Sequence, residues 1–386
     1  MSAEMDVIIL GGGCAGLALA REMSLRTHNL RVLVIEPRKN YAEDRTWCFW
    51  MAGSDGLRPA SRMQWDQWRL SSGGASITHH PQLWRYHMVS SADYYADALS
   101  AIGKSGRVTL RLDTRAGTVT ADNGCYRVET TAGPVRGRFI IDTRPPSLAR
   151  IKAAPLAQLF SGLEVRVERD VFDPRTATLM GNMTAEGGRL SFDYILPFSP
   201  RHALIERTVF TTAPEEPATL DGPCLARVEA LCGSGASIVR QERGWLPMGL
   251  PDAPSADGAV IRAGLSVGAL RPSSGYAFKR IQRWASVCAD SLVSSGKPSV
   301  EFADPVALRV MDQVFLRAMT HSIGGAPGDF VRIARALNGD RFARFMSDEA
   351  TRADWLKVIA ALPKTRYLAA TVSIIRAWSQ GRNAPC

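Results

Sequence analysis

The chain has 386 residues, of which 46% are apolar and 22% charged, and its net charge is +10. This length exceeds what a single hydrophobic core usually organises, so two or three structural units are expected. The composition is that of a globular protein and excludes a disordered chain. The seven cysteines contain no CxxC pair and the six histidines show no metal-ligand spacing, so neither a disulfide framework nor a metal site is predicted.

The basic residues are spread along the chain without a nucleic-acid-binding motif, so nucleic acid is not an expected partner. The charge also fits an anionic membrane surface, where each Lys or Arg adds about 1 kcal/mol of attraction, and it fits an ordinary solvated surface equally well. The chain start lacks a signal-peptide pattern, and the longest apolar stretch, residues 7–20, is too short to span a bilayer. We therefore expect a cytoplasmic protein without a transmembrane helix.

The start of the chain predicts a nucleotide-binding turn. Asp6 is followed by four apolar residues, 7–10. Gly11, Gly13 and Gly16 come next in GxGxxG spacing. A second apolar run ends at Glu36, twenty residues after Gly16. Gly11 permits the tight turn and Gly13 lets the backbone approach a pyrophosphate. Gly16 lets the next helix pack close to the sheet.

The position of this turn indicates which nucleotide it binds. The helix begins at Cys14 and Ala15, where free N–H groups and the positive end of the helix dipole would face phosphates. Glu36 can accept hydrogen bonds from ribose hydroxyls and would repel a 2′-phosphate. The motif lies close to Met1, as in flavoproteins resembling the FAD-dependent disulfide reductases, and is not repeated. FAD is therefore expected rather than NAD or NADP.

The remaining chain divides by its residue patterns. Residues 1–150 are expected to hold the FAD-binding domain, with an inserted segment at 76–100. Alternating apolar and polar residues predict an antiparallel substrate-binding sheet at 151–250. The chain then returns to the FAD domain at 251–300, and helical apolar spacing predicts a helical region at 301–386. The predicted class is α/β: a Rossmann-like FAD domain of the two-dinucleotide-binding type, an inserted antiparallel sheet and C-terminal helices.

Many segments of the chain resemble the bacterial flavin-dependent lycopene β-cyclases. The segments that carry the resemblance are 44–49, 141–146, 171–174, 177–180, 194–199, 203–210, 242–248, 268–276, 311–316, 344–347 and 362–363. The resemblance implies a non-redox, proton-initiated cyclisation of the acyclic ends of lycopene to β-rings, giving γ-carotene and then β-carotene. It also implies reduced FAD as the active cofactor and NAD(P)H as the ultimate reductant, for which no binding site is evident.

The implied substrate, lycopene or a related acyclic carotenoid, dissolves in the bilayer. It therefore implies peripheral docking on the cytoplasmic side of a membrane. Either the aromatic loops near residues 50–85 or the C-terminal helices could form the docking face. The sequence does not indicate an oligomeric state, the exact carotenoid range, or whether one or both ends are cyclised.

The resemblance assigns the catalytic acid to Glu206. A carboxyl with apolar neighbours has a raised pKa, because desolvation penalises its charged form, so Glu206 could stay protonated near neutral pH. The alternative is a solvent-facing glutamate paired with Arg207. Trp47 and Trp245 are candidates for the walls of a substrate cavity, where their π-faces would attract a carbocation, or they are ordinary packing residues.

Further residues are expected at the FAD site from the matched motifs. They are Arg45, Thr46, Asp142, Gly268, Gly275 and Tyr276. Glu242 is expected to hold structure or flavin rather than to do chemistry. The chain departs from the family after Met180, where many members carry an acid and this one has Gly181 and Asn182; Asp193 is a candidate substitute.

Two other functions fit the same residues. An FAD-dependent prenyl or carotenoid reductase, or a monooxygenase, would share the fold. Such enzymes usually carry a Gly-Asp pair near the position of residues 268–272, where this chain has Gly-Ala-Leu-Arg-Pro. A carotenoid-binding flavoprotein without catalysis is the third reading, and the missing acid after Met180 favours it.

Overall fold

The structure, a computed structural model, describes residues 4–53, 62–250, 256–257, 260–299 and 304–379. The strands are β1 (Met5–Leu10), β2 (Val32–Ile35), β3 (Thr46–Ala52), β4 (Met63–Trp65), β5 (Gln67–Ser72), β6 (Ala75–His79), β7 (Trp84–Ser90), β8 (Val108–Arg111), β9 (Ala116–Asp122), β10 (Cys125–Thr130), β11 (Val135–Asp142), β12 (Leu156–Arg166), β13 (Thr176–Glu186), β14 (Arg189–Ser199), β15 (His202–Thr211), β16 (Ser237–Met248), β17 (Ala256–Asp257) and β18 (Val260–Arg262). The helices are α1 (Cys14–Ser24), α2 (Ser91–Lys104), α3 (Leu148–Lys152), α4 (Asp221–Cys232), α5 (Phe278–Ser295), α6 (Val306–His321), α7 (Ala326–Ala336), α8 (Gly339–Met346), α9 (Arg352–Ala361) and α10 (Lys364–Ser379), with short 3₁₀ turns η1 (Pro217–Leu220), η2 (Gly264–Val267) and η3 (Ile323–Gly325).

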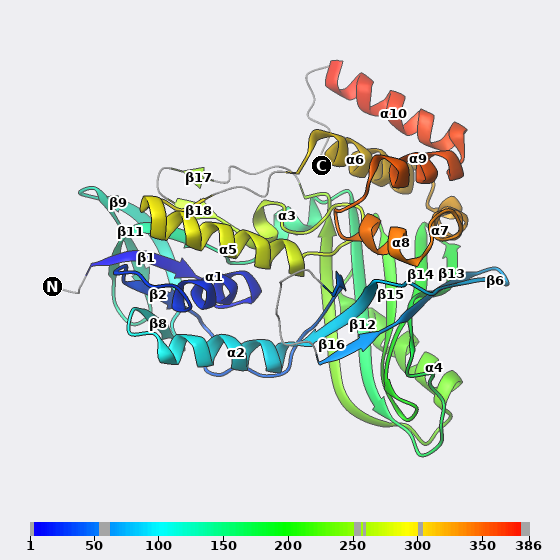
Figure 1. Ribbon diagram of the computed structural model, residues 1–386, viewed down its shortest axis with the longest axis horizontal. Coiled ribbons are helices and arrows are strands. Elements are labelled where there is room, and N and C mark those ends of the chain that lie inside the picture. Colours follow the sequence, from blue (N-terminus) through cyan, green and yellow to red (C-terminus); the bar gives the residue numbers. More distant parts are fainter. Residues whose placement is uncertain (1–3, 54–61, 251–255, 258–259, 300–303, 380–386) are drawn as a thin grey trace.

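A largely parallel sheet forms one half of the molecule (Figure 1). Strands β18, β11, β1, β2 and β8 lie side by side in parallel, and the antiparallel hairpin of β9 and β10 joins β11. Both faces of β1 are covered: Val7 and Ile9 belong to the core that includes α1 and α5, whereas Ile8 and Leu10 pack with the hairpin side. Burial on both faces explains why these strands are continuously apolar. The predicted α/β class with a Rossmann-like domain is confirmed.

A seven-stranded sheet forms the other half. Its order is β16-β12-β15-β14-β13-β5-β6, and all neighbours are antiparallel except β13 and β5. An antiparallel sheet was predicted, but from residues 151–250 alone; β5 and β6, which come from the N-terminal part of the chain, extend it. Residues 76–100, expected as an inserted segment, contribute to several elements. There β7 pairs with β3 and β4 in a separate small sheet, and α2 packs against α1.

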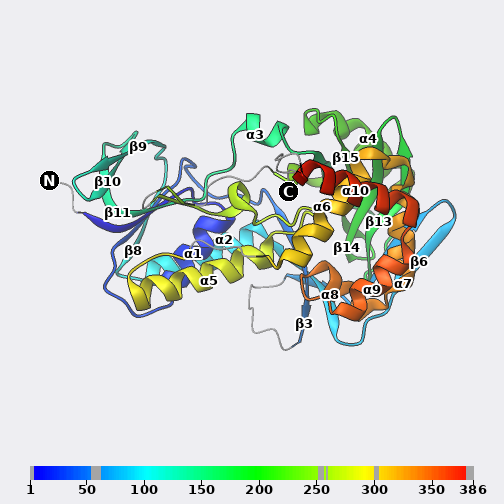
Figure 2. The same cartoon turned by 90° about the horizontal axis from the view of Figure 1, so that it is seen from above.

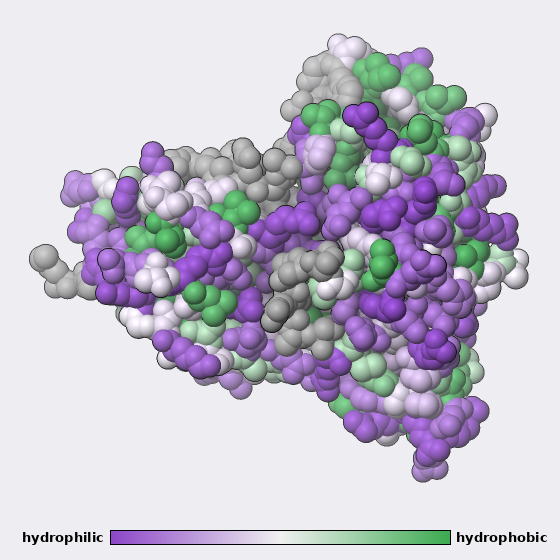
Figure 3. Space-filling model, in the orientation of Figure 1, coloured by the Kyte–Doolittle hydropathy of each residue, from purple (hydrophilic) through white to green (hydrophobic). Residues whose placement is uncertain are grey.

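Five helices at the end of the described chain cover one face of the seven-stranded sheet. Helix α7 contacts β5, β6 and β13, α8 contacts β3 and β7, and α10 packs along α6 (Figure 2). No single described helix is long and apolar enough to cross a bilayer; α9 and residues 364–377 of α10 reach that composition together but are bent by 113°. Hydrophobic residues gather on the surface over α10 (Figure 3).

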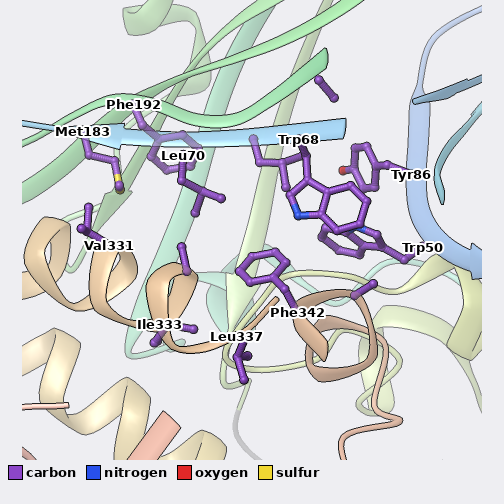
Figure 4. Close-up of a cluster of buried hydrophobic side chains, with 14 of the residues drawn as sticks. Trp50, Trp68, Leu70, Tyr86, Met183, Phe192, Val331, Ile333, Leu337 and Phe342 are labelled. Atoms are coloured by element: carbon purple, nitrogen blue, oxygen red, sulfur yellow. The ribbon is translucent and has the colours of Figure 1, made fainter. Parts of the chain in front are cut away.

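The core between this sheet and the C-terminal helices is aromatic (Figure 4). Trp68 on β5 faces Phe342 of α8, with ring centroids 6.3 Å apart, and Trp50 packs against Tyr86 at 4.6 Å. The indole N–H of Trp68 donates to Nδ1 of His79 at 2.8 Å, and Nε2 of His79 bonds to a carbonyl of α7 at 2.8 Å. These aromatic residues are therefore structural, and they join β5 and β6 to the helices.

A buried ion cluster joins the segment before α5 to the C-terminal helices. Arg271 is almost fully buried and its Nη2 lies 3.3 Å from Oδ1 of Asp312 on α6. Its Nη1 lies 3.2 Å from Asp348 and donates to the carbonyl of Phe345 at 2.6 Å. Asp312 also accepts a hydrogen bond from Ser273 at 2.7 Å. The cluster satisfies a buried guanidinium on several sides, which fixes α6 and α8 against this segment.

Replacing Asp312 by Ala should destabilise the protein by about 3 kcal/mol, because it removes one of the two carboxylates that balance the buried Arg271. A thermal unfolding scan would show a clear fall in Tm. Asp290→Ala is the matched control, since it removes an exposed carboxylate that pairs with Arg26 at 2.7 Å, and its Tm should stay near that of the parent. Equal Tm values for both variants would contradict a structural role for the cluster.

Candidate active site

A cavity of about 840 Å³ extends from the first turn of α1 to the C-terminal helices. It passes along the inner face of the seven-stranded sheet, which presents Phe160, Phe192, Glu206 and Phe210 to it. A cavity of this size, mostly apolar with a few polar groups, is typical of a site for a small molecule.

The cavity brings many of the predicted site residues together. Those that line it are Gly13, Cys14, Ala15, Arg45, Thr46, Trp47, Glu206, Trp245, Gly275 and Tyr276. The others lie outside its lining: Gly11, Gly16, Glu36, Asp142 and Gly268. The first group therefore borders the cavity directly, and the second group lies next to it.

The glycine-rich turn has the geometry that its spacing predicts. Gly11 has a φ of +95°, which favours glycine. A Cβ on Gly16 would lie 1.9 Å from the carbonyl oxygen of Gly11, so only glycine allows α1 to approach this turn so closely. At Gly13 the nearest atom to an added Cβ is Nη2 of Arg38 at 3.8 Å. The open space beside Gly13 adjoins the first turn of α1. No side chain caps this turn, so the N–H groups of α1 can donate to a phosphate.

Glu36 lies beside this turn and is buried. Its Oε2 accepts the N–H of Gly12 at 2.6 Å, and its Oε1 accepts Nε of Arg38 at 3.0 Å. Oε1 also accepts the backbone N–H of Arg38 at 3.0 Å, so it is Oε2 that keeps a lone pair for a ribose hydroxyl. Arg38, which the sequence reading missed, stacks over Tyr41 and Tyr95 at 5.1 and 5.6 Å from their ring centroids. An acid, a cation and free amides at one turn fit the ribose and pyrophosphate of a dinucleotide such as FAD.

Three other residues predicted for the cofactor site have structural partners. Asp142 pairs with Arg144, whose Nη2 lies 2.6 Å from Oδ2. Gly268 has a φ of +91° and ends the turn η2. Burial raises the pKa of the Cys14 thiol to about 12, so this cysteine stays neutral and serves as a packing residue beside the turn.

The two tryptophans predicted for the cavity lie in different surroundings. Trp47 stacks on Phe278 at 5.6 Å and meets Tyr94 edge-on at 5.1 Å, so it belongs to the core of the nucleotide-binding half. Trp245 lies on β16, and its buried indole N–H has no hydrogen-bond partner in the part of the chain that the structure describes. Of the two, Trp245 has the polar group free for a ligand.

Glu206 and Glu242 lie close together because the residue between them, Gly162, has no side chain. Gly162 on β12, the strand between β15 and β16, is the register partner of Glu206 on β15 and of Glu242 on β16. A Cβ on Gly162 would lie 2.8 Å from Cγ of Glu206 and 3.4 Å from Cγ of Glu242. Because glycine stands between them, the two carboxyl groups, both buried, come within hydrogen-bonding reach.

A chain of charged groups continues from Glu242 along the same face of the sheet. Oε2 of Glu242 accepts the hydroxyl of Thr46 at 2.8 Å and a hydrogen bond from Nη1 of Arg240. Nε of Arg240 lies 3.0 Å from Glu164, and Nε2 of His202 lies 2.8 Å from the same carboxylate. Arg240 thus balances Glu242 and Glu164, which leaves Glu206 as the carboxyl without a cation of its own among the described residues.

This arrangement sets the protonation state of Glu206. Burial raises the pKa of Glu206 well above its ordinary value, and the neighbouring Glu242 raises that pKa further. Arg240 opposes the shift but is the smallest contribution. Glu206 is therefore a neutral acid in an apolar wall, and the solvent-facing alternative weighed from the sequence is excluded by its burial.

Three tyrosines surround the same carboxyl. The hydroxyl of Tyr86 lies 2.8 Å from that of Tyr194 and 2.9 Å from that of Tyr276. Tyr194 is the register partner of Glu206 across β14 and β15. Tyr276, predicted for the cofactor site, thus lies beside the acid, and burial holds its pKa and those of the other two tyrosines above the ordinary value.

Asp193 does not replace the acid that many relatives carry after Met180. Its carboxylate binds Arg207 at 2.9 Å and Arg227 of α4 at 2.8 Å. Arg207 follows Glu206 on β15, so Asp193 and Arg207 lie on the face of the sheet that α4 covers, away from the cavity. Asn182 donates to Asp193 at 2.8 Å and completes this structural cluster.

The fold of the chain has counterparts among solved structures. A geranylgeranyl bacteriochlorophyll reductase-like protein from Thermoplasma acidophilum superposes with a TM-score of 0.61 and 13% identity, covering 97% of this chain and 99% of that one. A probable FAD-dependent monooxygenase from Pseudomonas aeruginosa has a TM-score of 0.51 and 16% identity, covering 90% and 100%. At such identities the likeness concerns the fold alone.

Sequence comparison identifies the family. The chain is 26% identical over 395 residues to a lycopene beta-cyclase from Paracoccus sp. (strain N81106 / MBIC 01143), covering 93% of this chain and 94% of the relative. It is 24% identical over 407 residues to a lycopene beta-cyclase from Pantoea ananas, covering 97% and 99%. The family described as "Lycopene cyclase protein" matches residues 6–371. The resemblance seen in the sequence is thus confirmed, and the chain belongs to the lycopene cyclase family.

Proposed function

We propose that this protein is a lycopene β-cyclase that binds FAD and converts the acyclic ends of lycopene to β-rings, giving γ-carotene and then β-carotene. The observation that carries this proposal is the carboxyl of Glu206, buried beside Glu242 in the wall of a mostly apolar cavity, where burial raises its pKa. An acid with a raised pKa keeps its proton available for transfer to a carbon–carbon double bond, and the apolar walls exclude water that would capture the resulting cation.

The reaction needs one proton in and one proton out. Glu206 donates its proton to the terminal double bond of the substrate, which leaves a tertiary cation. The neighbouring double bond attacks this cation and closes the ring, and a ring proton then leaves and can return to the Glu206 carboxylate. The product is an isomer of the substrate, so no net electrons are exchanged.

The cavity walls would protect and stabilise the cation. Phe160 and Phe192 on the sheet, together with Trp245, offer π-faces, and cation–π attraction is worth up to about 2 kcal/mol in a desolvated site. The hydroxyls of Tyr86, Tyr194 and Tyr276 bond to one another in the same wall of the cavity.

Gly13, Cys14 and Ala15 would hold the pyrophosphate of FAD, and Glu36 the ribose. Arg45 and Gly275 line the cavity farther along and would contact the rest of the cofactor. When bound, reduced FAD supplies negative charge that can stabilise a nearby cation. The reduced state, and NAD(P)H as the ultimate reductant, rest on the resemblance to the family. The location that we propose, peripheral on the cytoplasmic side of a membrane, follows from a substrate that dissolves in lipid.

Glu206→Gln should abolish cyclisation, because an amide cannot donate the required proton. We would express the variant and the parent in a bacterium that accumulates lycopene and separate the pigments by chromatography. The parent should form β-carotene or γ-carotene. Glu129→Gln, at an exposed glutamate of β10, should match the parent. Cyclic pigment from the Glu206 variant would contradict the assignment of the acid.

The same extracts test the redox alternative, a prenyl or carotenoid reductase or a monooxygenase. Solved structures with these descriptions share the fold of this chain. Cyclisation leaves the mass of lycopene unchanged, whereas reduction adds hydrogens and oxygenation adds an oxygen atom. Mass spectrometry of the pigments therefore separates these outcomes. Lycopene that is bound but recovered unchanged would instead favour the non-catalytic carotenoid-binding flavoprotein.

Glu242→Gln should move the alkaline limb of the pH profile to lower pH. Glu206 is active when protonated, so activity falls as the pH rises through its pKa. Because Glu242 raises that pKa, its removal lowers the pKa of Glu206, and the fall occurs earlier. Turnover of lycopene by purified protein across a pH series measures the shift. An unchanged limb would show that burial alone sets the protonation of Glu206.

Gly13→Ala should weaken FAD retention without unfolding the protein. Gly13 has a φ of −79°, which alanine adopts readily, and its Cβ would meet only Nη2 of Arg38, at the ordinary contact distance of 3.8 Å, in the space proposed for the pyrophosphate. Flavin absorbance per mole of purified protein measures the loss. Gly103→Ala, at a helix position of α2 with nothing within 4 Å, is the control and should keep its flavin. Full flavin content in the Gly13 variant would contradict this placement.

A further inference from the structure

The far end of the cavity lies between three C-terminal helices. Val310 and Met311 of α6, Ile359 of α9, and Leu368 and Thr371 of α10 all line it. Ile359 and Leu368 are also exposed to the outside. A side chain that lines a cavity and is exposed marks its mouth, so the cavity opens at α9 and α10.

An unusual number of apolar side chains is exposed around this mouth. We define the apolar ridge as five residues of α9 and α10, each between 45% and 67% exposed: Leu356, Ile359, Leu368, Val372 and Ile375. On α10 the spacing of four and then three residues places the last three on one face of the helix. The ridge lies under the hydrophobic surface seen over α10 in Figure 3. Contiguous exposed apolar surface of this kind marks an interaction site.

The exposed charges on the same two helices all have one sign. They are Arg352, Lys357, Lys364 and Arg376, and the one acid of this stretch, Asp354, is fully buried and caps α9. A face that combines apolar side chains with basic ones is complementary to an anionic lipid surface, which offers hydrocarbon beneath a layer of negative headgroups.

Helix α10 is held firmly to the rest of the protein. Arg366 forms an ion pair with Asp329 of α7 and donates to the carbonyl of Ala318 in α6 at 3.1 Å. Arg317 of α6 donates to the hydroxyl of Ser373 at 2.9 Å. The outward face of α10 is therefore a fixed surface of the folded protein, and its exposed residues are not needed to fix the helix in place.

The other candidate face, the aromatic loops near residues 50–85, exposes Leu83 but no comparable group of large apolar side chains among its described residues. Residues 54–61 of that stretch lie outside the described residues. In the rest of it Trp50, Trp65, Trp68 and Trp84 are all buried. These rings belong to the core that joins the sheet to the helices, so they are not free to enter a membrane.

The geometry points to the apolar ridge of α9 and α10 as the face that docks on an anionic lipid bilayer, with the mouth of the cavity held against the lipid. This inference rests on the proposed function, because a carotenoid dissolved in the bilayer is what the mouth would receive. Docking in this orientation lets an apolar substrate pass from lipid to cavity without crossing water.

Vesicle binding by the full-length, flavin-loaded protein tests this inference. The parent should sediment with vesicles of phosphatidylcholine and phosphatidylglycerol, bind less to pure phosphatidylcholine, and lose part of its binding at high salt. The double variant Val372→Ser with Ile375→Ser should bind at least about tenfold more weakly, since each side chain loses its transfer into lipid. Neither residue lines the cavity. Lys357→Gln with Arg376→Gln should weaken binding to the anionic vesicles only.

The matched control is Val287→Ser with Val293→Ser on α5, which removes two apolar side chains of 51% and 39% exposure from a helix in the nucleotide-binding half. It should bind vesicles as the parent does. The Val372→Ser, Ile375→Ser protein is the α10 variant. If it binds vesicles as strongly as the parent does, the inference is overturned. A dimer in light scattering that the α10 variant dissociates, without a change in vesicle binding, would also overturn it, because a second copy would then cover the ridge.

Turnover in two media separates this inference from the proposed function. The α10 variant should convert lycopene in detergent micelles like the parent and lose conversion of lycopene held in anionic vesicles. If the parent cyclises lycopene in neither medium, the proposed function fails, while the sedimentation results still decide whether the ridge binds lipid. Equal loss in micelles and vesicles would assign these residues to folding and contradict the inference.

Discussion

The site depends on two carboxyl groups confined side by side in an apolar wall. Two adjacent buried carboxyl groups cannot both carry charge without a large penalty, so one must keep its proton unless a cation balances it. Arg240 balances Glu242, and no equivalent cation stands beside Glu206 among the described residues. Gly162 on β12 makes this possible, because a side chain at this position would separate the two carboxyl groups. The absence of a side chain at Gly162 thus places Glu242 where it raises the pKa of Glu206.

Thr46 connects the two halves of the molecule at this point. It opens β3, which follows the nucleotide-binding strands in the chain, and its hydroxyl reaches Glu242 on the far sheet. Arg45, beside it, donates to the carbonyl of Arg243 at 3.1 Å. A cofactor held at α1 and an acid held on β15 therefore share a boundary built from residues 45–46. A substitution at residue 45 or 46 would therefore alter contacts of the nucleotide-binding half and of the seven-stranded sheet together.

The sequence predicted what depends on local pattern and missed what depends on pairing. The turn around Gly11 and Gly16 and the alternation of the sheet strands follow from spacing alone. Glu242 was expected to hold structure or flavin, because nothing in its own segment shows that it pairs across β12 with Glu206. The pairing of β5 with β13 was also missed, since parallel pairing joins residues more than a hundred positions apart. Register between distant strands leaves no local trace in the chain.

The cavity changes in character along its length, and this gradient matches the proposed chemistry. Near Glu206 the cavity is lined by buried residues of the sheet, and burial together with the neighbouring Glu242 raises the pKa of the acid. At α9 and α10 the same cavity is bordered by exposed apolar and basic residues. A long apolar molecule that entered at the helices would therefore meet water nowhere on its way to the acid. Its leading end alone would reach Glu206, so reaction at one end of the molecule would leave the other end outside, and a second cyclisation would require release and re-entry with the opposite end first.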